Sequence, residues 1–143
     1  MTSAEDIGPS ENLGRSVFSR GQAKRASRGI VPFHVFLEKE GEPLISVDRL
    51  DKSKSREAMQ IAQSIATARV RTFYGWAVVI ADVAASNGRR VTPSPQPSNP
   101  FHADIVLPAP AIEDRDEQKQ HAQELATEAQ WRGLDEVRPP DIG

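Results

Sequence analysis

The alternation of apolar and polar side chains predicts a β-hairpin in the first third of the chain. Residues 30–37 form its first strand, with apolar side chains at every odd-numbered position on one side. A polar turn containing Gly41 follows, and residues 44–47 return as the second strand. Pro32 cannot donate to a strand ladder, so it favours an edge or the first position of the strand.

Two longer segments have apolar residues at helical spacing. Residues 54–69 follow the N-cap candidate Ser53, and their narrow, alanine-rich stripe favours close packing against a sheet. Residues 113–131 begin with acids that suit the helix dipole and end before Gly133. The two stripes comprise Ala58, Ile61, Ala62, Ile65 and Ala68 in the first helix and Ala122, Leu125, Ala126 and Ala129 in the second.

Two further segments have strand patterns. Residues 72–81 are apolar on both alternating faces, which is typical of a central strand covered on both sides. Gly75 within this segment indicates a bulge or a close backbone approach. The Asn-Gly pair at 87–88 predicts a turn, and the alternating prolines of residues 92–100 favour an extended polyproline II segment. Residues 101–107 alternate again and predict a last strand.

These elements predict an α+β fold. We expect a mostly antiparallel sheet of about four strands with both main helices on one face, in the order strand-strand-helix twice. A short N-terminal helix should precede them, capped by Ser19 and ended near Gly29. The single domain is expected to span residues 14–134, between flexible tails of residues 1–13 and 135–143.

Composition excludes several classes of site. The chain has 143 residues and no cysteine, so disulfides, zinc–thiolate sites and cysteine nucleophiles are ruled out. No phosphate-binding loop of the G-x-x-x-x-G-K-[ST] type and no G-x-S-x-G nucleophile elbow occurs. We therefore predict no cofactor and no metal. The polar, acidic start is unlike a secretory signal and no apolar run would cross a bilayer, so we expect a cytoplasmic protein.

Charge is distributed unevenly along the chain. Residues 14–28 contain cations and no acid, whereas residues 113–128 are mainly acidic. The basic segment is a candidate for contacting phosphates, although attraction between the two ends would also explain the pattern. The candidate binding cations are Arg15, Arg20, Lys24, Arg25 and Arg28.

A candidate working surface follows from the strand alternation. If the helices cover one face of the sheet, the opposite face carries two histidines, an aspartate and aromatic side chains. The long strand adds either Tyr74 and Trp76 or the pair at 73 and 75, and the first choice suits a half-wet surface. The surface would then comprise His34, Phe36, Tyr74, Trp76, His102 and Asp104.

Three functions fit such a surface. It can be an interface with a protein partner or a second copy, a stacking platform for single-stranded nucleic acid, or a general acid–base site. We favour a non-enzymatic binding or adaptor domain that acts with a protein partner or as a homo-oligomer. The alternative is a nucleic-acid-acting protein, either a single-strand binder or a metal-independent, histidine-dependent ribonuclease.

The catalytic candidates of that alternative are His34, His102 and Asp104. Either Asp104 or Asp48 would orient one histidine, while the other histidine would act as its partner. The third histidine, His121, is expected to be a surface residue of the acidic helix.

Overall fold

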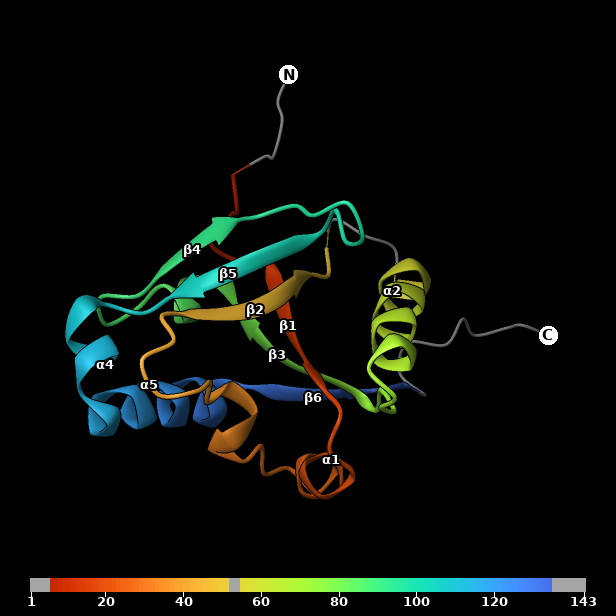
Figure 1. Cartoon of the computed structure of the whole chain (residues 1–143), viewed down its shortest axis with the longest axis horizontal. Helices are drawn as coiled ribbons and strands as arrows, with labels where there is room; N and C mark the ends of the chain where they lie inside the picture. Colours follow the sequence, from red (N-terminus) through yellow and green to blue (C-terminus); the bar gives the residue numbers. More distant parts are fainter. Residues whose placement is uncertain (1–5, 52–54, 135–143) are drawn as a thin grey trace.

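The computed structural model describes residues 6–51 and 55–134, which form an antiparallel sheet with helices against both faces (Figure 1). Among these residues the sheet has six strands in the order β4-β5-β2-β1-β3-β6. The strands are β1 Asn12–Val17, β2 Leu44–Arg49, β3 Gly75–Ile80, β4 Arg90–Pro93, β5 His102–Val106 and β6 Gln130–Gly133. The helices are α1 Arg20–Ser27, α2 Ser55–Ala68, α3 Ala81–Ala84, α4 Ala109–Glu113 and α5 Arg115–Glu128, with a 3₁₀ helix, η1, at Phe33–Phe36. The predicted α+β class with an antiparallel sheet is confirmed.

The larger core lies between α5 and one face of the sheet. Alternate residues of the strands point into it, including Leu13, Ile45 and Ile105, all almost fully buried. Leu125 of α5 and Phe36 of η1 complete the same cluster. On β5, as the alternation of residues 101–107 predicted, the apolar residues are the ones that point into this core.

The second core lies on the opposite face, beneath α2. Ala58, Ala62 and Ala66 follow one another at four-residue intervals and pack against Trp76 and Leu50. The small side chains allow the close approach that the stripe predicted. However, α2 and α5 lie on opposite faces, so the prediction that both helices share one face is wrong. The sheet buries both sides because β3 is apolar at every position.

The predicted hairpin over residues 30–47 is also wrong in its first half. Its first segment contains η1, which begins after Pro32 and buries the consecutive residues Val35 and Phe36. A run that is apolar at nearly every position fits both a strand and a tight helical turn, and docking against α5 selects the turn. The strand that actually precedes it is β1, and the predicted domain boundary at residue 13 falls inside this strand.

Several predicted elements are confirmed with adjusted ends. Ser19 caps α1 by accepting a hydrogen bond from the backbone N–H of Gln22 at 3.2 Å. Helix α2 covers most of residues 54–69, while its expected cap Ser53 lies outside the described residues. The last predicted helix is divided at Asp114, which caps α5, and Trp131 belongs to β6 instead.

The sheet contains a seam between β1 and β2. These strands pair over only two positions, Leu13 with Arg49 and Gly14 with Asp48. At one end the backbone N–H of Leu50 still donates to the Asn12 carbonyl oxygen at 3.0 Å, but no β1–β2 pair follows Gly14 toward Val17, although β1 pairs with β3 along its whole length. At the seam, Arg15 donates from Nη1 to the carbonyl oxygen of Ser46 of β2 at 3.0 Å. A guanidinium thus replaces the missing rung of the ladder.

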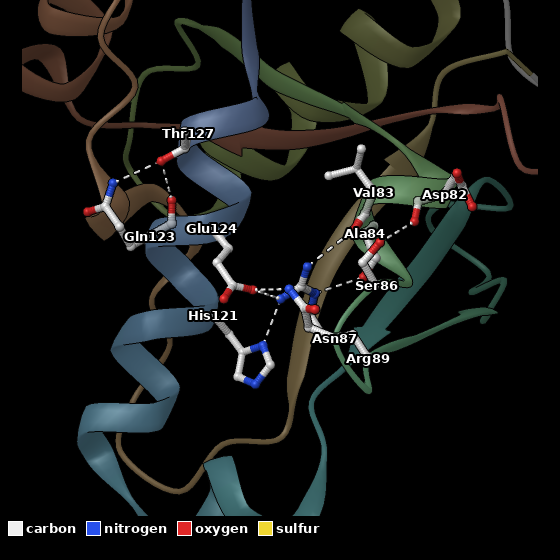
Figure 2. A network of polar contacts seen from close by, with 10 residues as sticks. All are labelled: Asp82, Val83, Ala84, Ser86, Asn87, Arg89, His121, Gln123, Glu124 and Thr127. Carbon is white, nitrogen blue, oxygen red and sulfur yellow. Dashed lines mark hydrogen bonds and ion pairs between the residues drawn. The ribbon is translucent and has the colours of Figure 1, made fainter.

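A buried polar network fixes α5 to the turn after α3 (Figure 2). Arg89 is 3% exposed and donates to the carbonyl oxygens of Ala84 and Val83, at 2.9 and 3.1 Å. Its Nη1 lies 2.8 Å from Glu124 Oε1 and 2.7 Å from His121 Nδ1, both on α5. His121 is only 7% exposed, so its predicted surface position is wrong, because Arg89 gives its ring a buried partner.

The turn that carries Arg89 was correctly predicted. Asn87 and Gly88 both have positive φ, which is the reason for an Asn-Gly pair at this point.

Near the start of the described chain, Glu11 forms a buried ion pair with Arg49, with an Nε–Oε2 distance of 2.6 Å. None of the helices among the described residues has the length and hydropathy of a membrane span.

Candidate functional site

A polar cleft with a volume of ≈ 660 Å³ lies along the seam of the sheet. Strands β1 and β2 form its floor with Gly14, Ser16, Ser46 and Asp48. The remaining walls come from α2 and the segment after it, from the η1 segment, and from the turn before β5. Their side chains include Ala62, Ile65, Arg69, Arg71, His34, Glu38, Lys39, Gln96, Asn99 and His102.

Asp48 is held at the end of β2 by two side-chain donors. Asn99 Nδ2 donates to its Oδ1 at 2.7 Å, and the indole Nε1 of Trp76 donates to its Oδ2 at 3.2 Å. Asn99 is itself fixed, because its Oδ1 accepts from the backbone N–H of Phe101 at 3.1 Å. Both carboxylate oxygens therefore have a defined direction, which pre-organises the group.

Gly14 makes the contact between Trp76 and Asp48 possible. It lies on β1, between the strands that carry these two residues. A Cβ atom at this position would lie 2.9 Å from Trp76 Cγ and Cδ1 and 2.8 Å from Leu50 Cδ1. Glycine leaves room for the indole to cross β1 and reach the carboxylate of Asp48.

The electrostatics of Asp48 reflect opposing influences. Burial raises the pKa of Asp48 above its usual range and is the largest influence, since the charged form loses solvation. The hydrogen bonds from Asn99 and Trp76 and the positive charges of His102 and Arg15 act in the lowering direction. A carboxyl balanced in this way is typical of functional sites.

His102 lies directly opposite Asp48 in the ladder between β2 and β5. Its Nδ1 is 2.7 Å from Ser94 Oγ and 3.2 Å from the carbonyl oxygen of Ser94. Because a carbonyl oxygen only accepts, this pair of contacts favours a proton on Nδ1. In the neutral ring, Nε2 then carries the lone pair and is the basic nitrogen.

The outer walls of the cleft are cationic. Arg69 and Arg71 are exposed at the end of α2 and beyond it, and Lys39 is exposed on the η1 side. No hydrogen bond or ion pair joins these three side chains to another residue in the part of the chain that the structure describes. The cleft is therefore suited to an anionic ligand.

The structure gathers three of the predicted site residues, Arg15, His34 and His102, around this one cleft. Arg15 is largely committed: it forms an ion pair with Glu38 and donates from Nε to the Val35 carbonyl oxygen at 3.0 Å. His34 is exposed and stacks on Phe33, with ring centroids 4.0 Å apart. It lies in η1 rather than on the predicted strand.

The predicted aromatic surface does not form. Phe36 is 1% exposed within the α5 core, and Trp76 is completely buried beneath α2. Tyr74 lies half-buried just before β3, and Asp104 is half-buried in β5, and neither lines the cleft. The prediction of an exposed aromatic face is wrong because α2 covers the face that carries Trp76, and because Phe36 lies in η1, which packs against α5, and not on a strand.

The remaining predicted cations lie on α1 and at its C-cap, outside the cleft lining. All four side chains are exposed, and α1 reaches the cleft through Ser19 and Gln22. They are Arg20, Lys24, Arg25 and Arg28.

Sequence reasoning missed Asn99, Gly14 and the arginines of the α2 wall. Asn99 belongs to the proline-rich segment, for which we predicted only an extended conformation, yet it precedes His102 by three residues and donates to Asp48. The available signal was its type, because an amide is the side chain that satisfies a buried carboxylate without adding charge. Gly14 gave no signal, since its role depends on a neighbouring strand far away in sequence.

Comparisons with known protein families, with curated proteins and with solved structures found no match to this chain. The geometry of the cleft is therefore the basis for a functional proposal.

Proposed function

We propose that this chain is a nucleic-acid-acting protein that binds single-stranded RNA in the seam cleft and cleaves it without a metal, using His102. The observation that carries the proposal is the placement of His102, held at Nδ1 by Ser94 and lying opposite the Asp48 carboxylate inside a cleft with cationic walls. An imidazole and a carboxylate in a polar cleft are the usual means of moving protons near neutral pH.

The cleavage step uses the ribose 2′-hydroxyl as the nucleophile. His102 Nε2 takes the proton of this hydroxyl, and the 2′-oxygen bonds to phosphorus as the bond from phosphorus to the 5′-oxygen breaks. The imidazolium of His34, the second histidine that lines the cleft, gives its proton to the leaving 5′-oxygen. The products are a 2′,3′-cyclic phosphate and a 5′-hydroxyl, and water restores both histidines.

The other cleft residues support this role. Asp48 lies directly opposite His102 in the ladder, which places its carboxyl group beside the imidazole that takes the proton. Arg15 is occupied by its hydrogen bonds to Ser46 and Val35. Arg69 and Arg71, which line the cleft, are therefore the arginines that would neutralise the phosphate. The two tasks, holding the sheet and binding the anion, fall to different arginines.

The test uses end-labelled single-stranded RNA of mixed sequence incubated with the whole chain in excess EDTA. We expect shortened RNA that ends in a cyclic phosphate, and no cleavage of the matching DNA, which lacks the 2′-hydroxyl. His102→Gln should reduce the rate about 100-fold or more, since general acid–base catalysis contributes about 10²–10⁴-fold.

Asp104→Asn provides the matched control. Asp104 lies two residues from His102 on the same strand and the same face, but outside the cleft lining. It should cleave like the unchanged chain. RNA that stays intact, or equal rates for both variants, would remove the ribonuclease proposal.

Binding to a protein partner or a second copy is a second proposal, carried by the edges of the sheet. Strands β4 and β6 end the strand order in the described residues, so each has an edge that no other strand covers there. Such edges bind extended peptides by strand addition. Light scattering after size exclusion, at low and high salt, tests this proposal. A dimer whose mass is unchanged by salt and by RNA would support it. A monomer at both salt concentrations would rule out self-association.

A further inference from the structure

We infer that the cleft selects a uracil base through an open rung of backbone groups between β1 and β2. The inference rests on the proposed nucleic-acid function and names the base that the site would bind. The open rung consists of the backbone of Ser16 on β1 and of Ser46 on β2, and both residues line the cleft. Ser16 is half-buried and Ser46 is exposed, so a ligand in the cleft has access to them.

The register of the sheet places these two serines opposite each other. Gly14 pairs with Asp48 in the β1–β2 ladder. Two residues further along each strand, the same register brings Ser16 opposite Ser46. No such pair forms among the described residues, and β1 runs on from this point toward α1 (Figure 1). The ladder is therefore interrupted at the position where the cleft lies.

Strand alternation fixes the direction of the backbone groups. The N–H and C=O of one residue point to the same side of a strand, and the side alternates with each residue. The Asn12 carbonyl oxygen accepts from Leu50 N–H at 3.0 Å, so Asn12 faces β2, and Ser16, four residues later, faces β2 as well. The Ser46 carbonyl oxygen faces β1, because it accepts from Arg15 Nη1 at 3.0 Å.

Three of the four backbone groups of this rung are open. Arg15 occupies the fourth, which is the carbonyl oxygen of Ser46. Within residues 6–51 and 55–134, no hydrogen bond is made by the N–H and C=O of Ser16 or by the N–H of Ser46. Backbone groups inside a sheet normally have partners, so a ligand seated here would complete the hydrogen bonding of the sheet.

The order of the open groups selects the base. In an antiparallel rung the N–H of one residue lies opposite the C=O of the other, so the Ser46 N–H lies on the carbonyl side of Ser16. The open groups therefore run donor, acceptor, donor. The uracil edge runs acceptor, donor, acceptor, from O4 through the N3 proton to O2, and is complementary. Cytosine has an acceptor at N3 and guanine has a second donor, so neither base matches all the open groups.

The position of the open rung suits the proposed cleavage. Ser46 lies two residues along β2 from Asp48, which is opposite His102. Two residues of a strand span about 7 Å, which is comparable with the reach from a base to the phosphate of the same nucleotide. A uracil in the open rung and a phosphate near His102 therefore belong to one nucleotide.

Amide hydrogen exchange, followed by NMR on the whole chain, tests the open rung directly. In the free protein the Ser16 and Ser46 amides should exchange at least about tenfold faster than those of Arg15 and Val47, which face β3 and β5 in full ladders. Saturation with uridine 3′-phosphate, which the proposed reaction cannot cleave, should slow both serine amides about tenfold. Serine amides that are already protected in the free protein would overturn the inference, because the rung would then be closed.

The same titration measures base selectivity. Uridine 3′-phosphate should bind about tenfold more tightly than cytidine 3′-phosphate or N3-methyluridine 3′-phosphate, because both lack the donor at N3. Ser16→Ala keeps the backbone N–H and should keep this preference. Ser16→Pro removes that N–H, which takes no part in the β1–β3 ladder, and should bring the affinity ratio close to one, with circular dichroism to verify the fold. Equal affinities for these nucleotides in the unchanged chain would also overturn the inference.

The uracil site and the ribonuclease proposal can fail separately. His102→Gln should abolish cleavage yet keep the ratio of the nucleotide affinities. If no RNA is cleaved while uridine 3′-phosphate protects the Ser16 and Ser46 amides, the uracil site holds and the cleavage proposal fails. If RNA is cleaved equally after every base and these amides stay unprotected, the cleavage proposal holds and the uracil site is wrong.

Discussion

Replacing Arg89 with methionine tests the network that holds α5. Methionine keeps much of the apolar volume of the side chain while removing all of its donors, so the change isolates the polar contacts. In the native network these donors reach the carbonyls of Ala84 and Val83, Glu124 and His121.

The expected cost follows from which partners can be replaced. Val83 keeps a second donor, the backbone N–H of Ser86 at 3.1 Å, whereas Arg89 is the one donor to the Ala84 carbonyl within the described part of the chain. An unsatisfied buried acceptor costs about 1–3 kcal/mol. Glu124 is 32% exposed on its side chain and keeps Asn87, so water offsets much of its loss. We therefore expect a loss of about 3 kcal/mol in the free energy of unfolding, below the upper range for breaking a fully buried ion pair.

Urea denaturation and thermal melting measure this loss. A chain of this size should show a fall in Tm of about 10 °C for about 3 kcal/mol. Arg90→Met is the control, because Arg90 is the exposed neighbour on β4 and should change stability by less than about 0.5 kcal/mol. A loss below about 1 kcal/mol for Arg89→Met would refute the conclusion that this network anchors α5.

The same variant has an effect on pH dependence. Burial, and secondly the charge of Arg89, lower the pKa of His121 below its ordinary value of 6.5, while Glu124 and Glu117 act in the raising direction. Arg89 also lowers the pKa of Glu124 below its ordinary 4.5. Since both folded-state pKa values are depressed, the stability they contribute is present above the unfolded values and is lost as pH falls through the folded ones. Below pH 6.5 the unchanged chain should therefore lose stability, and Arg89→Met should lose less over the same range.

Three further substitutions test the cleft. Gly14→Ala places a Cβ against Trp76 and should cost about 1–3 kcal/mol in urea denaturation, with a change in tryptophan fluorescence; an unchanged spectrum would contradict the crossing of β1 by the indole. Trp76→Phe removes one donor from Asp48 and should reduce the free energy of unfolding by about 2 kcal/mol, whereas a neutral result would mean that this hydrogen bond is weak. Asn99→Ala removes a hydrogen bond that lowers the pKa of Asp48. The acid limb of the pH–rate profile for RNA cleavage should therefore move to higher pH, and a shift to lower pH would contradict the proposed role of the carboxylate.

Local patterns predicted the elements whose burial is simple. Helix α2 has one alanine stripe, and β5 alternates cleanly, so periodicity located both. Strand β1 was not predicted, because Gly14 and Arg15 occupy its middle. Neither residue type favours a strand, and their roles become clear only from their partners on other strands.

The candidate site was predictable only in part, for a related reason. His102 stood out by type, but its relation to Asp48 depends on the pairing of β2 with β5, which are separated by more than fifty residues. The α2 wall could not be anticipated while both helices were placed on one face. Side-chain chemistry was readable from the sequence, whereas the long-range pairing that brings it together was not.

The seam has a mechanical consequence. Two three-stranded plates, β4-β5-β2 and β1-β3-β6, meet along a short ladder of two residue pairs, which the backbone hydrogen bond from Leu50 to Asn12 extends at one end. Side chains make the other connections described above, including the Arg15 guanidinium and the Trp76–Asp48 hydrogen bond. Bending is therefore concentrated at this line, while each plate stays stiff through its own full ladders. Any molecule seated in the cleft touches both plates at once, so its arrival and departure are coupled to the angle between them.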